Sequence, residues 1–392
     1  MRIFFSAGEP SGDQHAAHLI QAMKVRDPDF QAEGFGGPAM KAEGCVLRFE
    51  LTQLAVMGVL RVLPMLAKFR RLVIQAEQHF DQTPPDAVVL VDFPGFNWWI
   101  ARAARRRGIP VYYYLPPQLW AWAPWRIRKV RRWVDHVICA LPFEYDWYHQ
   151  RGIKATWVGH PFFDEVASKQ LDDALVARLR SDHGRPVIAV LPGSRDHEVH
   201  RNFPVMLDVI RTVSEKVPDV RWVVGNYRQD HLNQCRQLQQ QQNVSADITY
   251  LTDRTSEVIE AADCCLMVSG SISLELLARQ TPGVVLYRVS RFARWASRIV
   301  MTCRYITLTN LIASEEVMPE FVSAGDPAND VQGISRWLTE LCMSPDTLQT
   351  CRQKMQDLAR RAAVVGATSR TAELLLAELN EETNAANSRQ AA

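Results

Sequence analysis

Short runs of β-branched and aromatic residues alternate with longer amphipathic stretches over most of the chain. Strands are predicted near Arg2–Ala7, Ala87–Asp92, Pro110–Leu115, Val134–Leu141, Ala155–Val158, Val187–Leu191, Arg221–Val224, Ile248–Leu251, Cys264–Val268, Gly283–Arg288 and Tyr305–Leu308. Between the first strands, helices are predicted at Gln14–Val25, Asn97–Arg107 and Phe143–Gln150. This alternation is typical of parallel sheets with helical crossovers.

The strand pattern pauses once, at the polar and charged stretch 168–185, and then restarts. A break of this kind, in a chain of about twice the usual domain length, predicts two α/β domains. We place them at 1–168 and 185–345, followed by C-terminal helices at 346–382 and a flexible tail at 383–392.

Composition narrows the class of protein. Of the 392 residues, 47% are hydrophobic and 22% are charged, which excludes a wholly disordered or collagen-like chain. The net charge of +2 does not imply a polyelectrolyte partner. No uninterrupted apolar run is long enough to span a bilayer, and the eight cysteines lack the spacing of a zinc site or a disulfide framework. We expect a soluble or peripheral protein of a reducing compartment, without a metal or another cofactor.

Two strand ends in the first half carry candidate chemistry. Gly8-Glu9-Pro10-Ser11-Gly12-Asp13 follows the first strand, where glycines let the backbone approach a ligand; the simpler interpretation is a strand–helix turn with Asp13 as helix cap. Asp92 ends a buried strand, the place where parallel sheets bind ligands, and could act as a general base toward a hydroxyl. The alternative is that Asp92 caps the helix that begins near Asn97, and the spacing fits this poorly.

Two turns in the second half are suited to anions. Pro192-Gly193-Ser194-Arg195 brings amides and a guanidinium together after an apolar strand, a combination that suits a phosphate or diphosphate. Ser269-Gly270-Ser271 also joins a strand to a helix, and Glu275 lies one turn further, within reach of a ribose diol. The simpler interpretation of either serine alone is a helix cap; two such turns in one half favour a ligand.

Two segments combine basic and apolar residues. Leu60–Val73 predicts a basic amphipathic helix, which suits either an anionic bilayer surface or a core-facing helix with a solvated basic face. Tyr112–Trp133 mixes aromatic and basic residues, but the nearly neutral chain argues against a nucleic acid partner. The chain has no Gly-x-Ser-x-Gly elbow, which disfavours a hydrolase.

Taken together, the motifs resemble those of the lipid-A-disaccharide synthase family. The matching segments are Gly8–Asp13, Leu54-Ala55-Val56-Met57-Gly58, Asp92–Asn97, Trp120-Ala121-Trp122, Leu141–Glu144, Val158–Pro161, Leu191–Arg195 and Ser269–Ser271. They occur in family order from residue 1 to about residue 325. The family pattern is not followed at Pro10, Gly95, Thr309 and Phe321-Val322-Ser323. These departures put the preference for acyl chain or acceptor in question, more than the type of reaction.

The resemblance implies a GT-B glycosyltransferase with two Rossmann-like domains facing a cleft. The expected reaction is inverting: it joins UDP-2,3-diacylglucosamine to 2,3-diacylglucosamine 1-phosphate, and it yields the β-1,6-linked lipid A disaccharide 1-phosphate and UDP. The resemblance also implies a peripheral location on the cytoplasmic face of a bacterial inner membrane, which favours a membrane-facing Leu60–Val73. Acyl-chain length and oligomeric state stay open.

Roles for individual residues follow from the same resemblance. Asp92 is expected to deprotonate the acceptor 6-hydroxyl, and Arg195 to offset charge on the departing UDP phosphate. The residues expected to bind substrate are Glu9, Ser11, Asp13, Gly193, Ser194, Ser269, Gly270, Ser271, Glu275 and Asn310. A GT-B transferase or epimerase with another acceptor, or an inactive membrane-binding protein, are the alternatives; intact Asp92 and Arg195 argue against the latter.

Overall fold

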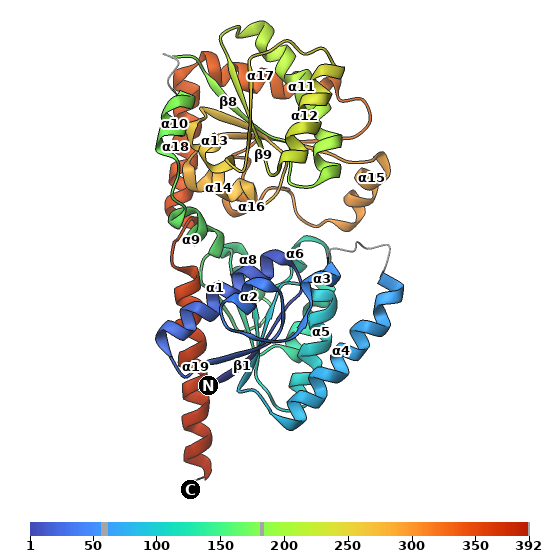
Figure 1. Cartoon of the computed structure of the whole chain (residues 1–392), viewed down its shortest axis with the longest axis vertical. Coiled ribbons are helices and arrows are strands. Elements are labelled where there is room, and N and C mark those ends of the chain that lie inside the picture. The colour runs from blue at the N-terminus through green and yellow to red at the C-terminus, as the bar shows by residue number, and fades with distance from the viewer. Residues whose placement is uncertain (56–61, 181–183, 391–392) are drawn as a thin grey trace. The chain divides into compact units, whose positions relative to one another are not determined.

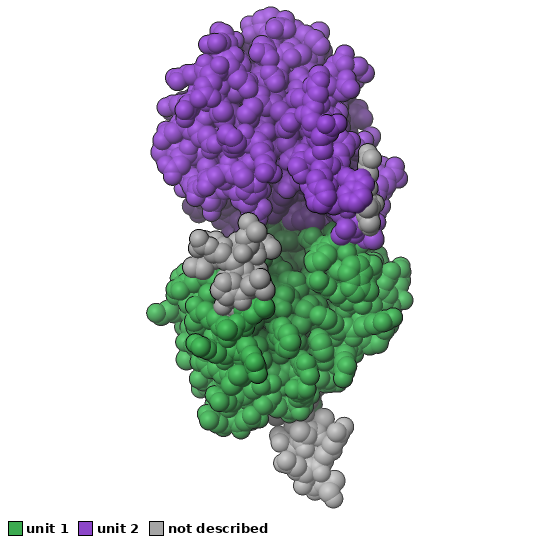
Figure 2. Space-filling model, turned by 90° about the vertical axis from the view of Figure 1, so that its right-hand side faces the viewer, with its two compact units in different colours: residues 1–164, 365–392 green, residues 165–364 purple. Residues whose placement is uncertain are grey.

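The computed structural model describes residues 1–55, 62–180 and 184–390 and divides into two compact α/β units (Figure 1). Unit 1 contains residues 1–164 and 365–392, and unit 2 contains residues 165–364 (Figure 2). Each unit has its own parallel sheet, as the alternating sequence pattern predicts. No described helix is long and apolar enough to cross a membrane.

The sheet of unit 1 has seven parallel strands in the order β3-β2-β1-β4-β5-β6-β7. The strands are β1 Arg2–Ala7, β2 Gln31–Gly36, β3 Val46–Glu50, β4 Ala87–Val91, β5 Val111–Tyr114, β6 His136–Cys139 and β7 Ala155–Trp157. The helices are α1 Pro10–Arg26, α2 Pro38–Ala42, α3 Thr52–Ala55, α4 Val62–Gln82, α5 Pro94–Arg105, α6 Leu119–Trp122, the 3₁₀ turn η2 Pro124–Arg126, α7 Ile127–Trp133, α8 Pro142–His149 and α19 Ala367–Gln390.

Helices cover both faces of this sheet, so successive residues of its central strands enter different cores. Phe4 of β1 packs with α5 residues in one core, whereas its neighbours Ile3 and Phe5 pack with α1 residues in the other. Burial on both faces explains why these strands read as continuous apolar runs in the sequence.

The sheet of unit 2 has six parallel strands in the order β10-β9-β8-β11-β12-β13. The strands are β8 Val187–Leu191, β9 Arg221–Asn226, β10 Ile248–Thr252, β11 Cys264–Met267, β12 Gly283–Arg288 and β13 Glu320–Ser323. The helices are α9 Pro161–Ser168, where the chain passes from unit 1 to unit 2, α10 Asp173–Arg180, α11 Asp196–Lys216, α12 Gln229–Gln241, α13 Thr255–Ala261, α14 Ile272–Arg279, α15 Arg291–Val300, α16 Leu308–Ala313, α17 Ala328–Met343 and α18 Pro345–Ala362.

The sequence pattern suggested a separate segment of C-terminal helices, but the last helix, α19, belongs to unit 1. α19 packs beside α1 in unit 1, and its Leu375 and Leu379 complete the core that holds Ile3 and Phe5 (Figure 1). The carboxylate of Asp164 accepts from the amide nitrogen of Thr368 at 3.0 Å, which ties the helix start to unit 1. Helical structure also continues to Gln390, into the segment expected to be a flexible tail.

One predicted strand is wrong, and three observed strands were not predicted. Tyr305–Leu308 is not a strand; the hydroxyl of Thr307 instead caps α16. The outer strand of that sheet is β13, which pairs with β12. In unit 1, β2 was not predicted because it contains two glycines; a Cβ on Gly34 would lie 2.0 Å from the carbonyl oxygen of Phe5, so this close strand approach requires glycine. The short polar strand β3 was not predicted either.

Candidate functional site

Both sheets have a topological switch point that coincides with predicted site residues. In unit 1, β1 and β4 are neighbours from which the chain winds in opposite directions, and the Gly8–Asp13 segment and Asp92 follow these strands. In unit 2, β8 and β11 have the same relation, and they are followed by Arg195 and the Ser269–Ser271 turn. Ligands of open α/β sheets bind in the crevice at this position, so each unit has a candidate ligand site of its own.

The backbone at Asp92 is held in an unusual conformation. Asp92 and Phe93 have φ values of 46° and 45°, in the left-handed region that is costly for residues other than glycine. The carbonyl oxygen of Asp92 accepts from the hydroxyl of Tyr113 at 2.8 Å and from Nδ2 of Asn97 at 2.7 Å. Asn97 Oδ1 in turn accepts from Ser6 Oγ at 2.7 Å, across the switch point. Residues from three elements therefore fix this turn, and Asp92 is not the cap of α5.

The Asp92 turn also packs tightly against the loop after β1. A Cβ on Gly8 would lie 2.1 Å from the ring of Phe93, so only glycine allows this contact. On its other side Phe93 lies 6.3 Å, between ring centroids, from Phe69 of α4. The loop at Gly8, helix α4 and the turn that carries the Asp92 carboxylate are thus packed against one another.

The environment of Asp92 is suited to proton transfer. The pKa of its carboxyl is raised to about 6, mainly by burial and also by the negative charge of Glu9, whereas the amide of Phe93 and the charge of His15 lower it. A carboxylate with this pKa is largely ionised at neutral pH, yet is a stronger base than an exposed aspartate. Proton abstraction from a hydroxyl is the chemistry that this arrangement supports.

Glu144 is a second buried carboxyl of this region, and sequence reasoning gave it no role. Its pKa is raised to about 7, mainly by burial and slightly by the charge of Asp92, although hydrogen bonds from Trp120 and the backbone lower it. Its Oε1 accepts from Nε1 of Trp120 at 3.0 Å and its Oε2 from the amide of Leu141 at 3.3 Å. The sequence signal was its place three residues inside α8, typical of a capping box; the bond to Trp120 is visible only in the fold.

The residues predicted around the first loop fall in two groups. Glu9 and Ser11 are exposed at the start of α1. Asp13 is buried, and its carboxylate accepts from the amides of Gly37 at 2.7 Å, Ala39 at 2.9 Å and Met40 at 3.1 Å. It therefore caps α2. Neither the expected contact with substrate nor a cap of α1 matches this arrangement, because the carboxylate is used by backbone amides of another helix.

Asp13→Ala is expected to lower the free energy of unfolding by about 3 kcal/mol, because three buried amides lose a charged acceptor. Denaturant unfolding measures this change. Asp29→Ala, which removes an exposed carboxylate beyond the far end of α1, is the control and should shift stability by less than about 0.5 kcal/mol. Native stability of the Asp13→Ala protein combined with weakened substrate binding would instead favour a direct binding role.

The turn after β8 already binds a carboxylate of the chain itself. Glu198 Oε2 accepts from the amides of Ser194 at 3.1 Å and Arg195 at 3.3 Å, and its Oε1 accepts from the Arg195 guanidinium at 3.1 Å. Gly193 has φ of 118°, and a Cβ there would lie 2.6 Å from Cβ of Glu198. The geometry is that of an anion-binding turn, but these two amides are occupied. The guanidinium of Arg195 is 71% exposed and remains accessible to a ligand.

The remaining predicted residues of unit 2 differ in accessibility. Gly270 and Ser271 are exposed at the start of α14, and Ser269 is half-buried beside them. Glu275 is buried and accepts from Nε of Arg279 at 3.0 Å.

Asn310 was expected near the donor sugar but has a structural role. It is fully buried, and its Nδ2 donates to the carbonyl of Met318 at 2.7 Å and to Glu320 Oε1 at 2.9 Å. Its Oδ1 accepts from the amides of Val317 and Met318, both at 2.9 Å. With two bonds donated and two accepted, the amide has no group left for a ligand.

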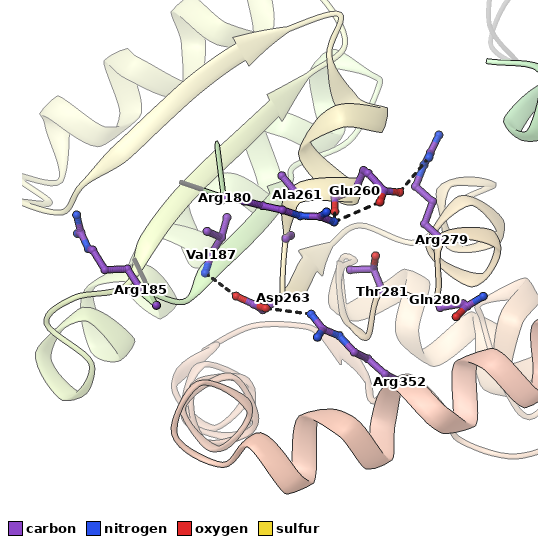
Figure 3. A pocket seen from close by; sticks show the side chains of 12 residues that line it. Arg180, Arg185, Val187, Glu260, Ala261, Asp263, Arg279, Gln280, Thr281 and Arg352 are labelled. Carbon is purple, nitrogen blue, oxygen red and sulfur yellow. Dashed lines mark hydrogen bonds and ion pairs between the residues drawn. The ribbon is translucent and has the colours of Figure 1, made fainter. Parts of the chain in front are cut away.

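A cavity of about 600 Å³ lies at the opposite edge of the same sheet, where the strands begin (Figure 3). Its arginines are paired within the chain: Arg180 and Arg279 with Glu260, and Arg352 with Asp263. Because these charges are neutralised and the cavity faces away from the strand ends, we assign it no part in the candidate site.

Comparison with known proteins adds a family relationship. A family model described as lipid-A-disaccharide synthetase matches residues 3–369. The lipid-A-disaccharide synthase of Myxococcus xanthus is 32% identical over 375 residues, covering 96% of this chain and 97% of that protein. The enzyme of the same name from Geobacter sulfurreducens is 30% identical over 382 residues, with 97% and 98% covered.

Solved structures share the fold at low sequence identity. The UDP-GlcNAc 2-epimerase of Neisseria meningitidis, bound to UDP-GlcNAc, has a TM-score of 0.64 at 12% identity, with 97% of this chain and 100% of that chain covered. A UDP-N-acetylglucosamine 2-epimerase from Listeria monocytogenes, itself assigned provisionally, has a TM-score of 0.66 at 11% identity, with 97% and 96% covered. These likenesses confirm the predicted fold class of two Rossmann-like α/β units, as in GT-B proteins.

Proposed function

Because this chain belongs to the lipid-A-disaccharide synthase family, which makes it a glycosyltransferase of lipid A biosynthesis, we propose that it transfers 2,3-diacylglucosamine from UDP to 2,3-diacylglucosamine 1-phosphate. The products are the β-1,6-linked disaccharide 1-phosphate and UDP. The observation that carries the proposal is the half-buried Asp92 carboxyl at the switch point of unit 1, whose pKa is raised to about 6.

In the proposed reaction the carboxylate of Asp92 accepts the proton of the acceptor 6-hydroxyl. The oxygen then attacks the anomeric carbon of the donor as the bond from that carbon to the UDP phosphate breaks. A single displacement of this kind inverts the anomeric configuration, and it needs no covalent nucleophile. Negative charge develops on the departing diphosphate, which the accessible guanidinium of Arg195 and the exposed turn at Ser269–Ser271 would stabilise.

The substrate class is tested by measuring UDP release with matched acceptors. We expect release with diacylglucosamine 1-phosphate and little or none with glucosamine 1-phosphate, which lacks the acyl chains. Equal release with both acceptors would point to a UDP-sugar transferase of different specificity. Release with neither would contradict the proposed function.

The acid side of the pH profile depends on Asp92. Below about pH 6 the carboxyl is protonated and cannot accept a proton, so kcat/KM should fall about tenfold per pH unit.

The charge of Glu9 contributes to the raised pKa of Asp92. Glu9→Gln should therefore lower that pKa and move the acid limb of the pH profile to lower pH. An acid limb that stays in place in the variant would show that Glu9 does not act on the titrating group.

We further propose that the enzyme works at an anionic membrane surface, on the cytoplasmic face of the inner membrane, where acylated substrates are held. On α4, Leu66 is 53% and Ile74 is 43% exposed, among the exposed cations Lys68, Arg70 and Arg71. Aliphatic and basic residues together suit a headgroup layer. By contrast Phe69 packs against Phe96 with ring centroids 5.4 Å apart, so it belongs to the core. Residues 60 and 61 of the predicted helix, and Val56-Met57-Gly58 of the family motif, lie outside the described residues.

A further inference from the structure

Helix α15 of unit 2 presents aromatic side chains to solvent. Phe292 is 74% and Trp295 is 60% exposed, and their ring centroids lie 5.9 Å apart, so the two rings form one continuous apolar surface. Val300 and Met301, at the end of the helix, are also exposed, at 49% and 41%. α15 has no extensive contact with another described element (Figure 1). Leaving two large aromatic rings in water is unfavourable, and such a surface marks an interaction site.

The sequence around this surface is basic. Residues 276–314 contain no Asp or Glu, and α15 itself carries Arg291, which is exposed, and Arg294, which is half-buried. On a helix, residues three apart share a face, so Phe292 and Trp295 occupy one side of α15 and Arg291 and Arg294 occupy the adjacent side. The occupant that this arrangement fits has an apolar interior and an anionic surface.

We propose that α15 is a membrane-binding element of unit 2, which lies in the headgroup layer of an anionic bilayer with Phe292 and Trp295 inserted toward the acyl chains. Tryptophan is favoured at this depth, and arginine pairs with lipid phosphates. Unit 2 thus has a lipid contact of its own, separate from that proposed for α4. The inference concerns lipid binding alone and does not depend on the reaction assigned to Asp92 and Arg195.

The test is co-sedimentation of the full chain with vesicles of phosphatidylglycerol or of phosphatidylcholine. The wild-type protein should bind phosphatidylglycerol more strongly, and salt should weaken that binding. Phe292→Ser/Trp295→Ser should lower the partition coefficient at least about tenfold, since two inserted rings are lost. Met343→Ser, which removes a side chain that is 67% exposed elsewhere in unit 2, is the control and should bind as the wild type does. Leu66→Ser/Ile74→Ser gives the corresponding comparison for α4.

Two further measurements keep the result specific. UDP affinity of the Phe292→Ser/Trp295→Ser protein should equal that of the wild type, which shows that unit 2 is folded. Amide hydrogen exchange in 290–304 should slow when phosphatidylglycerol vesicles are added. Unchanged sedimentation of the double variant, or an equal loss with Met343→Ser, would overturn the proposal. So would an oligomer without vesicles that the double variant dissociates, since the occupant would then be a second copy of the chain.

Discussion

Asp92→Asn is expected to lower the turnover number by about 10²–10⁴, the usual contribution of a general base. The substitution keeps the size of the side chain and removes only its capacity to accept a proton. The side chains of Tyr113 and Asn97 donate to the backbone carbonyl of Asp92, not to its carboxyl, so the turn should keep its shape. UDP affinity should change little, because the diphosphate is assigned to unit 2. Steady-state kinetics and calorimetric titration with UDP separate the two effects.

Asp86→Asn is the matched control, because Asp86 lies just before the opposite end of the same strand, β4. Its Oδ2 accepts from the amide of Arg2 at 2.6 Å, a bond that the asparagine oxygen can also accept. This variant should keep wild-type turnover. Wild-type activity in Asp92→Asn would remove the base assignment, and equal losses in both variants would indicate a folding defect.

Arg195→Ala is expected to lower kcat by about 10²–10³, the range found when one charge-stabilising donor is removed from a transition state. The stability of the fold should hardly change, because the guanidinium is 71% exposed and its pair with Glu198 is worth little in solvent. Arg195→Lys should recover only part of the loss, since an ammonium lacks the fork that matches two phosphate oxygens. Kinetics at saturating donor, together with thermal unfolding, measure both quantities.

Arg211→Ala serves as the control for Arg195, because Arg211 lies in α11, the helix that follows Arg195, and also forms an exposed ion pair, with Asp208. Its kcat should equal the wild-type value. If Arg195→Ala raised KM for the donor and left kcat unchanged, Arg195 would bind the diphosphate equally in the ground and transition states. That result would contradict a role in offsetting charge as UDP departs.

The principal candidates Asp92 and Arg195 were predictable because their signals are local. Each follows a run of buried apolar residues, and a parallel sheet brings such strand ends to one edge. The sequence pattern also predicted ten strands at positions close to those observed. It missed β2, which contains two glycines, and the short strands β3 and β13, whose apolar runs are interrupted or bounded by polar residues.

The other differences arise from contacts between distant segments. Asp13 caps a helix more than twenty residues away, and the side chain of Asn310 bonds the residues just before β13 and the first residue of that strand. No sequence pattern identifies the groups to which Asp13 and Asn310 are hydrogen-bonded. The match to the family motifs therefore suggested substrate contact for both residues. The return of α19 to unit 1 could not be predicted from periodicity, because an amphipathic stripe shows that a helix is packed and not which domain it packs on.

The anomeric configuration and linkage of the product test the central claim most directly. Wild-type protein would be given the α-linked UDP donor and the 1-phosphate acceptor, and the disaccharide would be analysed by NMR. A single displacement with Asp92 acting on the 6-hydroxyl predicts a β linkage to oxygen 6, with one UDP released per disaccharide. An α linkage, or a linkage to another hydroxyl, would contradict this account.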